Sequence, residues 1–177
     1  ALGIAETIVS TNDDWNTQNL GETFHKNFNK EPYRGYGRGP PQIFRTVEIT
    51  KESYNKVASE LFGGKGSFGN GASMRIAPLG FFYYDHPEIY KLAKKSAIVT
   101  HTNPLGIDGA ALLAKLNSIL IPRNPEELII QEKQNIIDDL IKFSKTNEYK
   151  EKLKKIKDLI INNESLIKAE RILGSDV

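Results

Sequence analysis

The sequence is most informative at Phe62-Gly63-Gly64-Lys65-Gly66-Ser67-Phe68-Gly69-Asn70-Gly71. The glycines at 64, 66 and 69 match the G-x-G-x-x-G pattern of dinucleotide-binding loops, which requires a strand directly before it. The preceding residues instead show helical spacing, because Thr50 can cap a helix over 51–61 whose apolar side chains share one face. The stretch is therefore a loop that follows a helix, and a Rossmann-type fold is excluded.

Two further motifs also fail in this loop. Lys65 is followed by glycine rather than by Ser or Thr, which excludes a Walker A loop. Ser67 lacks the glycine two residues earlier that a nucleophile elbow requires.

The remaining chemistry of the loop belongs to its backbone and its two aromatic rings. Closely spaced glycines expose N–H groups that can cradle an anionic ligand. Phe62 and Phe68 bracket the loop, and their rings could stack on a base, so a nucleotide would suit the site. The alternative is a glycine-rich connector whose two phenylalanines belong to the core. The residues alone leave both interpretations open.

Helical spacing dominates the rest of the chain. We expect helices over 1–9, 20–28, 51–61 and 85–101, then from Asn103, from Asn124 and around 153–160. Three of these start at a cap residue and a proline, in Asp85-His86-Pro87-Glu88, Asn103-Pro104 and Asn124-Pro125-Glu126-Glu127. A loop is expected over 30–42, and 43–49 is the one candidate strand. The pattern predicts an all-α fold in a single domain over 1–177.

Composition excludes several functional classes. The 177 residues include 24 Lys and Arg against 22 Asp and Glu, a formal net charge of +2, so a strongly basic nucleic-acid binder is disfavoured. The absence of cysteine rules out disulfides, thiol nucleophiles and Cys-ligated zinc. No apolar run is long enough to span a bilayer, and no signal-peptide pattern opens the sequence, so a cytoplasmic protein is the default expectation.

One histidine has surroundings that suit a ligand. His101 lies in Thr100-His101-Thr102-Asn103 at the expected end of a helix, where neighbouring hydroxyls offer hydrogen bonds. The alternative is a structural histidine whose hydrogen bonds are satisfied inside the protein.

Four blocks of sequence, taken together, carry a family resemblance. They are Arg34-Gly35-Tyr36-Gly37, the stretch from 64 to 80 that contains Gly69-Asn70-Gly71-Ala72-Ser73-Met74-Arg75, then Ser96-Ala97-Ile98-Val99-Thr100-His101, and 106–110. In residues, order and approximate spacing they resemble the ADP-ribosylglycohydrolase family, most of all its serine-ADP-ribose hydrolase branch. The resemblance covers essentially the whole chain, weakly after Leu120, and the Gly-Asn-Gly-x-x-Met-Arg block is its specific part.

The resemblance implies an all-α enzyme that uses two Mg²⁺ ions to hydrolyse the glycosidic bond between ADP-ribose and a protein side chain or a related leaving group. The glycine loop would bind the diphosphate and adenosine part, and two phenylalanines would flank the adenine. Phe68 stands where the branch usually has tyrosine, which keeps the stacking face and loses a hydroxyl. The implied ADP-ribose-binding residues are Gly35, Phe62, Gly66, Ser67, Phe68 and His101.

The resemblance places no catalytic residue and no metal ligand within this chain. The acidic motifs that hold the family's metal ions would lie just before residue 1 and well beyond residue 177, so we expect the central part of such a domain. In that case the apolar faces of the first and last helices should be exposed. Two hypotheses follow: an ADP-ribosyl hydrolase whose ADP-ribose-binding loops are in this chain, or a non-catalytic ADP-ribose-binding protein.

Overall fold

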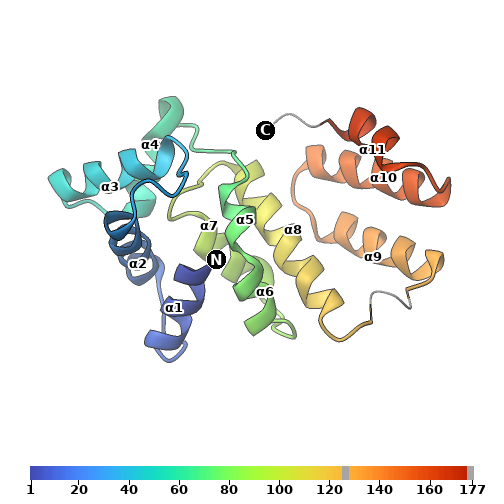
Figure 1. The fold of residues 1–177 in the computed structure, drawn as a ribbon, viewed down its shortest axis with the longest axis horizontal. Coiled ribbons are helices and arrows are strands. Elements are labelled where there is room, and N and C mark those ends of the chain that lie inside the picture. The colour runs from blue at the N-terminus through green and yellow to red at the C-terminus, as the bar shows by residue number, and fades with distance from the viewer. Residues whose placement is uncertain (125–127, 175–177) are drawn as a thin grey trace.

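A computed structural model describes residues 1–124 and 128–174 of the chain. Within these residues the chain forms eleven helices and no strand, so the expected all-α fold is confirmed (Figure 1). The helices are α1 (Leu2–Ser10), α2 (Thr17–Lys30), α3 (Gly39–Thr50), α4 (Tyr54–Gly64), α5 (Gly71–Arg75), α6 (Ala77–Phe82), α7 (Ile89–Ala97), α8 (Pro104–Leu120), α9 (Ile130–Phe143), α10 (Asn147–Ile161) and α11 (Leu166–Leu173).

The candidate strand over 43–49 is wrong, because these residues lie inside α3. A proline occupies the first turn of α3, where its missing N–H has no partner to lose. Ile43 and Phe44 are buried and Val47 packs against the same core, a spacing that fits one face of a helix. Since α3 begins at Gly39, the expected loop over 30–42 is also shorter than predicted.

The boundary between α3 and α4 differs from the prediction. Thr50 does not cap the next helix but is the last residue of α3, and α4 begins at Tyr54. Lys51 ends α3 with a left-handed φ of 62°. Tyr54, Val57 and Leu61 are buried together on α4, as their spacing indicated.

α7 is shorter than predicted at both ends. It begins at Ile89 rather than after Asp85, and the preceding residues form a turn in which the Glu88 N–H donates to Nδ1 of His86 at 3.1 Å. It ends at Ala97, and the chain continues through a turn to His101.

Other predicted helix starts have mixed outcomes. α8 begins as predicted, with the Asn103 side chain accepting a hydrogen bond from the Leu105 N–H at 3.0 Å. α2 starts earlier than expected because Asn16 caps it. In the predicted start at Asn124, residues 125–127 lie outside the described residues, and α9 begins at Ile130.

The core consists of two clusters that meet at α8. The larger cluster contains buried side chains from each of the first seven helices, α1 through α7. One face of α8 completes it, with Ile107, Ala110, Ala111 and Ala114. The smaller cluster packs Leu112 of α8 against apolar side chains of α9 and α10. α8 therefore runs between the two halves of the molecule, with α1–α4 on one side and α9–α11 on the other (Figure 1).

A buried carboxylate fastens α8 to the turn that precedes α10. Asp108 accepts hydrogen bonds from the hydroxyl of Ser144 at 2.7 Å, from the Thr146 hydroxyl at 2.7 Å and from the Thr146 N–H at 2.8 Å. The Lys145 N–H and the Tyr90 hydroxyl each donate to it at 3.1 Å. Burial by itself raises the pKa of Asp108, but these hydrogen bonds to the ionised form outweigh it, and the pKa is lowered overall.

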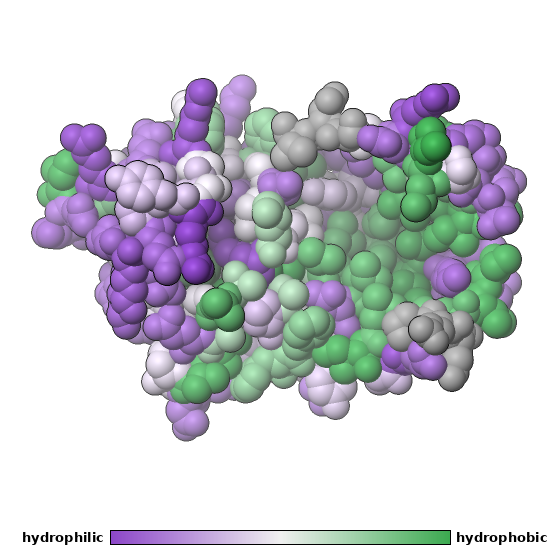
Figure 2. Space-filling view, viewed as in Figure 1, coloured by the Kyte–Doolittle hydropathy of each residue, from purple (hydrophilic) through white to green (hydrophobic). Residues whose placement is uncertain are grey.

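The surface differs between the two halves. Hydrophilic side chains cover much of the side over α1–α4, whereas hydrophobic side chains gather on the face over α8, α9 and α10 (Figure 2). None of the residues of α11 is buried, so the expected exposed face is found there. On α1 it is found only in part, because Ile4 and Ile8 are buried while Leu2 and Val9 are exposed. Within the described ranges, no helix combines the length and apolarity that crossing a membrane requires.

Candidate ligand-binding site

The glycine-rich stretch adopts backbone conformations that L side chains rarely take. Phe62, Gly63, Gly64 and Gly66 all have positive φ, at 54°, 68°, 81° and 67°. For Phe62 this left-handed conformation is strained, and such strain often marks functional loops. The backbone leaves the helical conformation at Leu61, so the loop predicted from the glycines begins inside the last turn of α4.

The loop is held against the segment that leads into α8. Gly66 approaches this segment so closely that an added Cβ would lie 2.0 Å from Thr102 Oγ1 and 2.9 Å from the Asn103 amide nitrogen. The Asn103 side chain donates to the Lys65 carbonyl oxygen at 3.1 Å. On α8 itself, a Cβ on Gly106 would lie 2.8 Å from the Ser67 carbonyl oxygen. Glycine is therefore needed at 66 and 106 for close backbone approach.

His101 stands against this loop. Its side chain is 6% exposed, and its Nδ1 lies 2.7 Å from the Thr100 hydroxyl. A Cβ added to Gly71 would lie 3.1 Å from Nε2 of the ring, so this nitrogen faces the glycine loop. Burial, assisted by the charge of Arg75, lowers the pKa of His101 to about 4. The imidazole is therefore neutral at pH 7, with one ring N–H to donate.

A cavity of about 990 Å³ opens beside the loop and His101. Its walls come from the start of α1, from α2, from the loop between α2 and α3, and from the glycine loop with α5. The volume lies within the range of small-molecule sites. Several of its polar wall residues are long cationic side chains, namely Lys30, Arg34, Arg38 and Arg75.

The structure brings four of the six expected binding residues to this cavity. Gly35, Phe62, Ser67 and His101 line it. Gly66 supports the loop from behind, through its contact with Thr102, and does not line the cavity.

The remaining expected residue, Phe68, is 69% exposed and is not among the lining residues. Phe62, on the cavity wall, is 59% exposed. Neither ring therefore belongs to the core, contrary to the connector alternative in the sequence analysis.

Sequence reasoning assigned no role to Arg75, although it quoted this residue within the most specific block. Nη2 of Arg75 donates to the carbonyl oxygens of Ser96 and Ala97, and Nη1 donates to that of Gly71. Its guanidinium carbon lies 4.8 Å from the centre of the Phe24 ring. Burial lowers the pKa of Arg75 to about 10, so it remains charged at pH 7. The sequence motif contains the arginine, but the carbonyl oxygens that its side chain contacts cannot be predicted from the motif.

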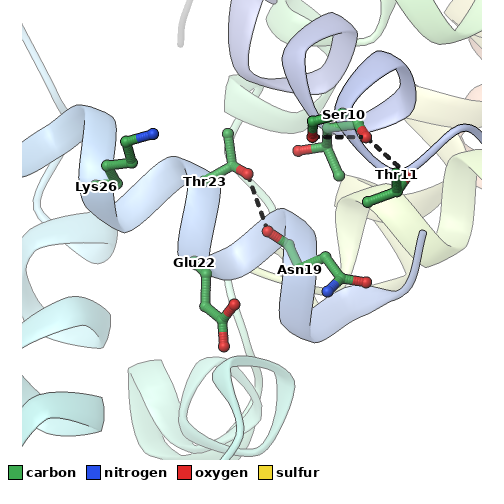
Figure 3. Close-up of a pocket in the computed structure, with 7 residues that line it drawn as sticks. Ser10, Thr11, Asn19, Glu22, Thr23 and Lys26 are labelled. Atoms are coloured by element: carbon green, nitrogen blue, oxygen red, sulfur yellow. Dashed lines mark hydrogen bonds between the residues drawn. The ribbon is translucent and has the colours of Figure 1, made fainter. Parts of the chain in front are cut away.

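A second, smaller hollow of about 380 Å³ lies between α1 and α2. Figure 3 shows that hydroxyls around it are engaged locally, with Thr23 donating to the Asn19 carbonyl oxygen at 3.0 Å. Thr11, which directly follows α1, likewise donates to the Thr7 carbonyl oxygen at 2.8 Å. These groups satisfy the helix backbone rather than facing a ligand.

The acidic residues of the larger cavity are engaged in pairs. Glu6 accepts from the Asn27 amide at 2.9 Å and pairs with Lys26 at 3.6 Å, while Glu31 pairs with Arg34. In residues 1–124 and 128–174, no three Asp, Glu or His side chains come together in a way that could hold a metal ion. These residues therefore do not fit the pair of Mg²⁺ ions that the resemblance implies.

Comparison with known proteins identifies the family of this chain. Residues 1–175 match the ADP-ribosylglycohydrolase family, and the chain belongs to that family. It is similar to ADP-ribosylhydrolase ARH3 of Xenopus tropicalis, with 35% identity over 117 residues, which is 64% of this chain and 33% of that protein. It is also similar to the proteins of the same name from Gallus gallus and Homo sapiens, with 40% and 36% identity over 96 residues, 54% of this chain and 26% of each relative. The chain thus spans about a third or less of the length of these relatives.

Proposed function

We propose that this chain carries the ADP-ribose-binding loops of a hydrolase that removes ADP-ribose from modified protein side chains. The observation that carries the proposal is the convergence of the glycine loop, Phe62 and His101 on one cavity of about 990 Å³. Family membership and the similarity to ADP-ribosylhydrolase ARH3 support it. The ligands are ADP-ribose and ADP-ribosylated proteins, and the nearly neutral chain gives no reason to propose nucleic acid.

The diphosphate would bind to the glycine loop. Within the described residues, the amide groups of Ser67 and Phe68 donate to no other group, whereas the Gly66 N–H donates to the Leu61 carbonyl oxygen at 3.0 Å. Free backbone amides in a glycine loop are suited to phosphate oxygens. The ring N–H of neutral His101 would donate to the ribose or to the diphosphate from the side of Nε2.

The adenine would stack on Phe62, which lines the cavity, and Phe68, which is outside the lining residues, would flank it from the glycine loop. Phe62 and Phe68 are both exposed large apolar residues, and stacking on a base would remove part of their surface from water. Base stacking on an aromatic ring is worth about 1–3 kcal/mol per base. Gly35, with a φ of 73° and no neighbour within 4 Å of an added Cβ, would offer backbone to the ligand across the cavity.

In the hydrolysis, water forms a bond to the anomeric carbon of the ribose, the glycosidic bond breaks, and the protein side chain recovers a proton. We include Mg²⁺ as the cofactor because the family is metal-dependent, with two ions in the resemblance. The described residues do not fit these ions, so no step of the reaction is assigned to a metal held by this chain. The part of this chain is to bind and orient ADP-ribose.

The test uses the product of the complete gene and a peptide that carries ADP-ribose on serine, with and without Mg²⁺. Release of ADP-ribose that requires Mg²⁺ is the expected result, and it would also support the serine linkage. Binding of ADP-ribose without release at any Mg²⁺ concentration would favour the non-catalytic binding protein. A product that neither binds nor releases ADP-ribose would refute both.

A further inference from the structure

Arg75 links three elements around the cavity. It is the last residue of α5, directly after the glycine loop, and its guanidinium reaches across to the end of α7. There it donates to the carbonyl oxygens of Ser96 at 3.2 Å and Ala97 at 3.4 Å. The face of the guanidinium packs on Phe24 of α2. A cation near the carbonyl end of a helix is favourable because these oxygens carry partial negative charge.

One carbonyl joins Arg75 to His101. The Ala97 oxygen that accepts from Arg75 also accepts the His101 N–H at 2.8 Å and the Thr100 N–H at 3.0 Å. Thr100 in turn contacts Nδ1 of the His101 ring. The backbone of His101 is thus bonded directly to the Ala97 carbonyl oxygen that accepts from Arg75, and its ring is linked to the same oxygen through Thr100.

We propose that Arg75 is a positioning residue, which fixes His101 over the glycine loop through the carbonyl oxygen of Ala97. Arg75 also acts through its positive charge, because a cation beside the buried ring disfavours protonation of the imidazole to a second cation. Three glycines, which carry no charge, also approach His101. An added Cβ on Gly69 or Gly71 would lie 3.8 Å or 3.1 Å from Nε2 of the ring, and one on Gly106 would lie 3.3 Å from Cβ of His101.

Within the described residues no carboxylate pairs with Arg75, and its Nε is buried without a hydrogen-bond partner. An arginine that served only to hold the fold would usually have its donors satisfied, because a buried unpaired donor costs about 1–3 kcal/mol. The uncompensated positive charge instead lies on the wall of the cavity, next to the histidine that faces it. This arrangement suits a site for an anionic ligand, in which Arg75 supplies the positive charge and neutral His101 donates its one ring N–H.

The test replaces Arg75 and follows His101 directly. Arg75→Gln removes the charge, Arg75→Lys keeps it with a different reach, and Arg45→Gln makes the same change on the exposed side of α3 as a control. The imidazole of His101 is titrated by NMR in each folded protein. We expect its midpoint near pH 4 in the wild type and again low in Arg75→Lys and Arg45→Gln. In Arg75→Gln the midpoint should rise but stay below 6.5, because burial is the larger cause of the lowered pKa and persists in that variant.

ADP-ribose binding is the second measurement, and only this part of the test rests on the proposed function. We expect Arg75→Gln to weaken ADP-ribose binding at pH 7 by about tenfold or more, and Arg45→Gln to leave it unchanged. An unchanged His101 midpoint in Arg75→Gln would overturn the inference. If that variant does not fold, the same measurement is made on Arg75→Met, which also removes the positive charge. The titration requires no ligand. A wild-type chain that fails to bind ADP-ribose would therefore refute the proposed function, while the His101 titration midpoint would still test the positioning role of Arg75.

Discussion

Gly66→Ala tests the close approach that places the glycine loop, and Gly63→Ala is its matched control. Both glycines have nearly the same left-handed φ, 67° at Gly66 and 68° at Gly63. At Gly63 an added Cβ meets nothing within 4 Å, whereas at Gly66 it would lie 2.0 Å from Thr102 Oγ1. The two substitutions therefore share the backbone strain and differ in the steric overlap.

The magnitudes follow from these two terms. A non-glycine residue in the left-handed region costs about 1 kcal/mol, which is all we expect for Gly63→Ala. At Gly66 the overlap adds about 1–3 kcal/mol. Thr102 cannot turn away freely, because its hydroxyl donates to the Ala58 carbonyl oxygen at 3.2 Å, and the Asn103 nitrogen 2.9 Å from the new Cβ is backbone. Gly66→Ala should thus lower the free energy of unfolding by about 2–4 kcal/mol.

The assay is urea unfolding of both variants and the wild type, followed by far-ultraviolet circular dichroism. Gly66→Ala should also weaken ADP-ribose binding, because relieving the overlap moves Ser67 and its free amide. Equal losses of stability in the two variants would refute the claim that the loop is pressed against the start of α8. A destabilised Gly66→Ala that binds ADP-ribose as well as Gly63→Ala would show that the contact does not shape the site.

Three further predictions concern buried polar groups. The pKa of His101 is lowered to about 4, so between pH 6.5 and 4 the unfolded state binds more protons than the folded state. The free energy of unfolding should therefore fall by about 3 kcal/mol over this range, and by less in His101→Asn. Asp108→Asn, which leaves donors without a charged acceptor, should cost about 2 kcal/mol or more in urea unfolding at pH 7. Because the pKa of Asp108 is lowered, its contribution is full above about pH 4 and is lost as the pH falls further, and this loss should be absent in the variant. Tyr83→Phe removes the acceptor of the buried Trp15 indole N–H and should lower the thermal midpoint, with a loss of about 1–3 kcal/mol; an unchanged midpoint would show that the hydrogen bond contributes nothing.

The helical fold could be predicted because apolar spacing and caps are local properties. Asn103 and Pro104 show the start of α8 in two adjacent residues, and the structure has the helix there. The candidate strand over 43–49 was wrong because β-branched residues also occur in helices, and here Ile43, Phe44 and Val47 pack on one helix face against the rest of the core. Tertiary packing decided between the two structures, and packing is not a local property.

The site was predictable only where chemistry was concentrated in the sequence. The glycine stretch was recognisable from composition alone, since few structures other than loops need so many glycines. The need for glycine at position 66 could not be predicted, because Thr102, which the backbone of Gly66 approaches, comes from a distant part of the chain. For Arg75 the same holds, since its role depends on the carbonyl oxygens of α7, and backbone atoms leave no signal in the side-chain pattern.

The most direct test of the account is calorimetric titration of ADP-ribose into this 177-residue chain and two matched variants. Phe62 and Phe81 are exposed to a similar extent, 59% and 53%, but only Phe62 lines the cavity. We predict saturable micromolar binding by the wild type, weakened about tenfold or more by Phe62→Ala and unchanged by Phe81→Ala. Absence of binding, or equal affinities in the two variants, would contradict the assignment of the cavity as the ADP-ribose site.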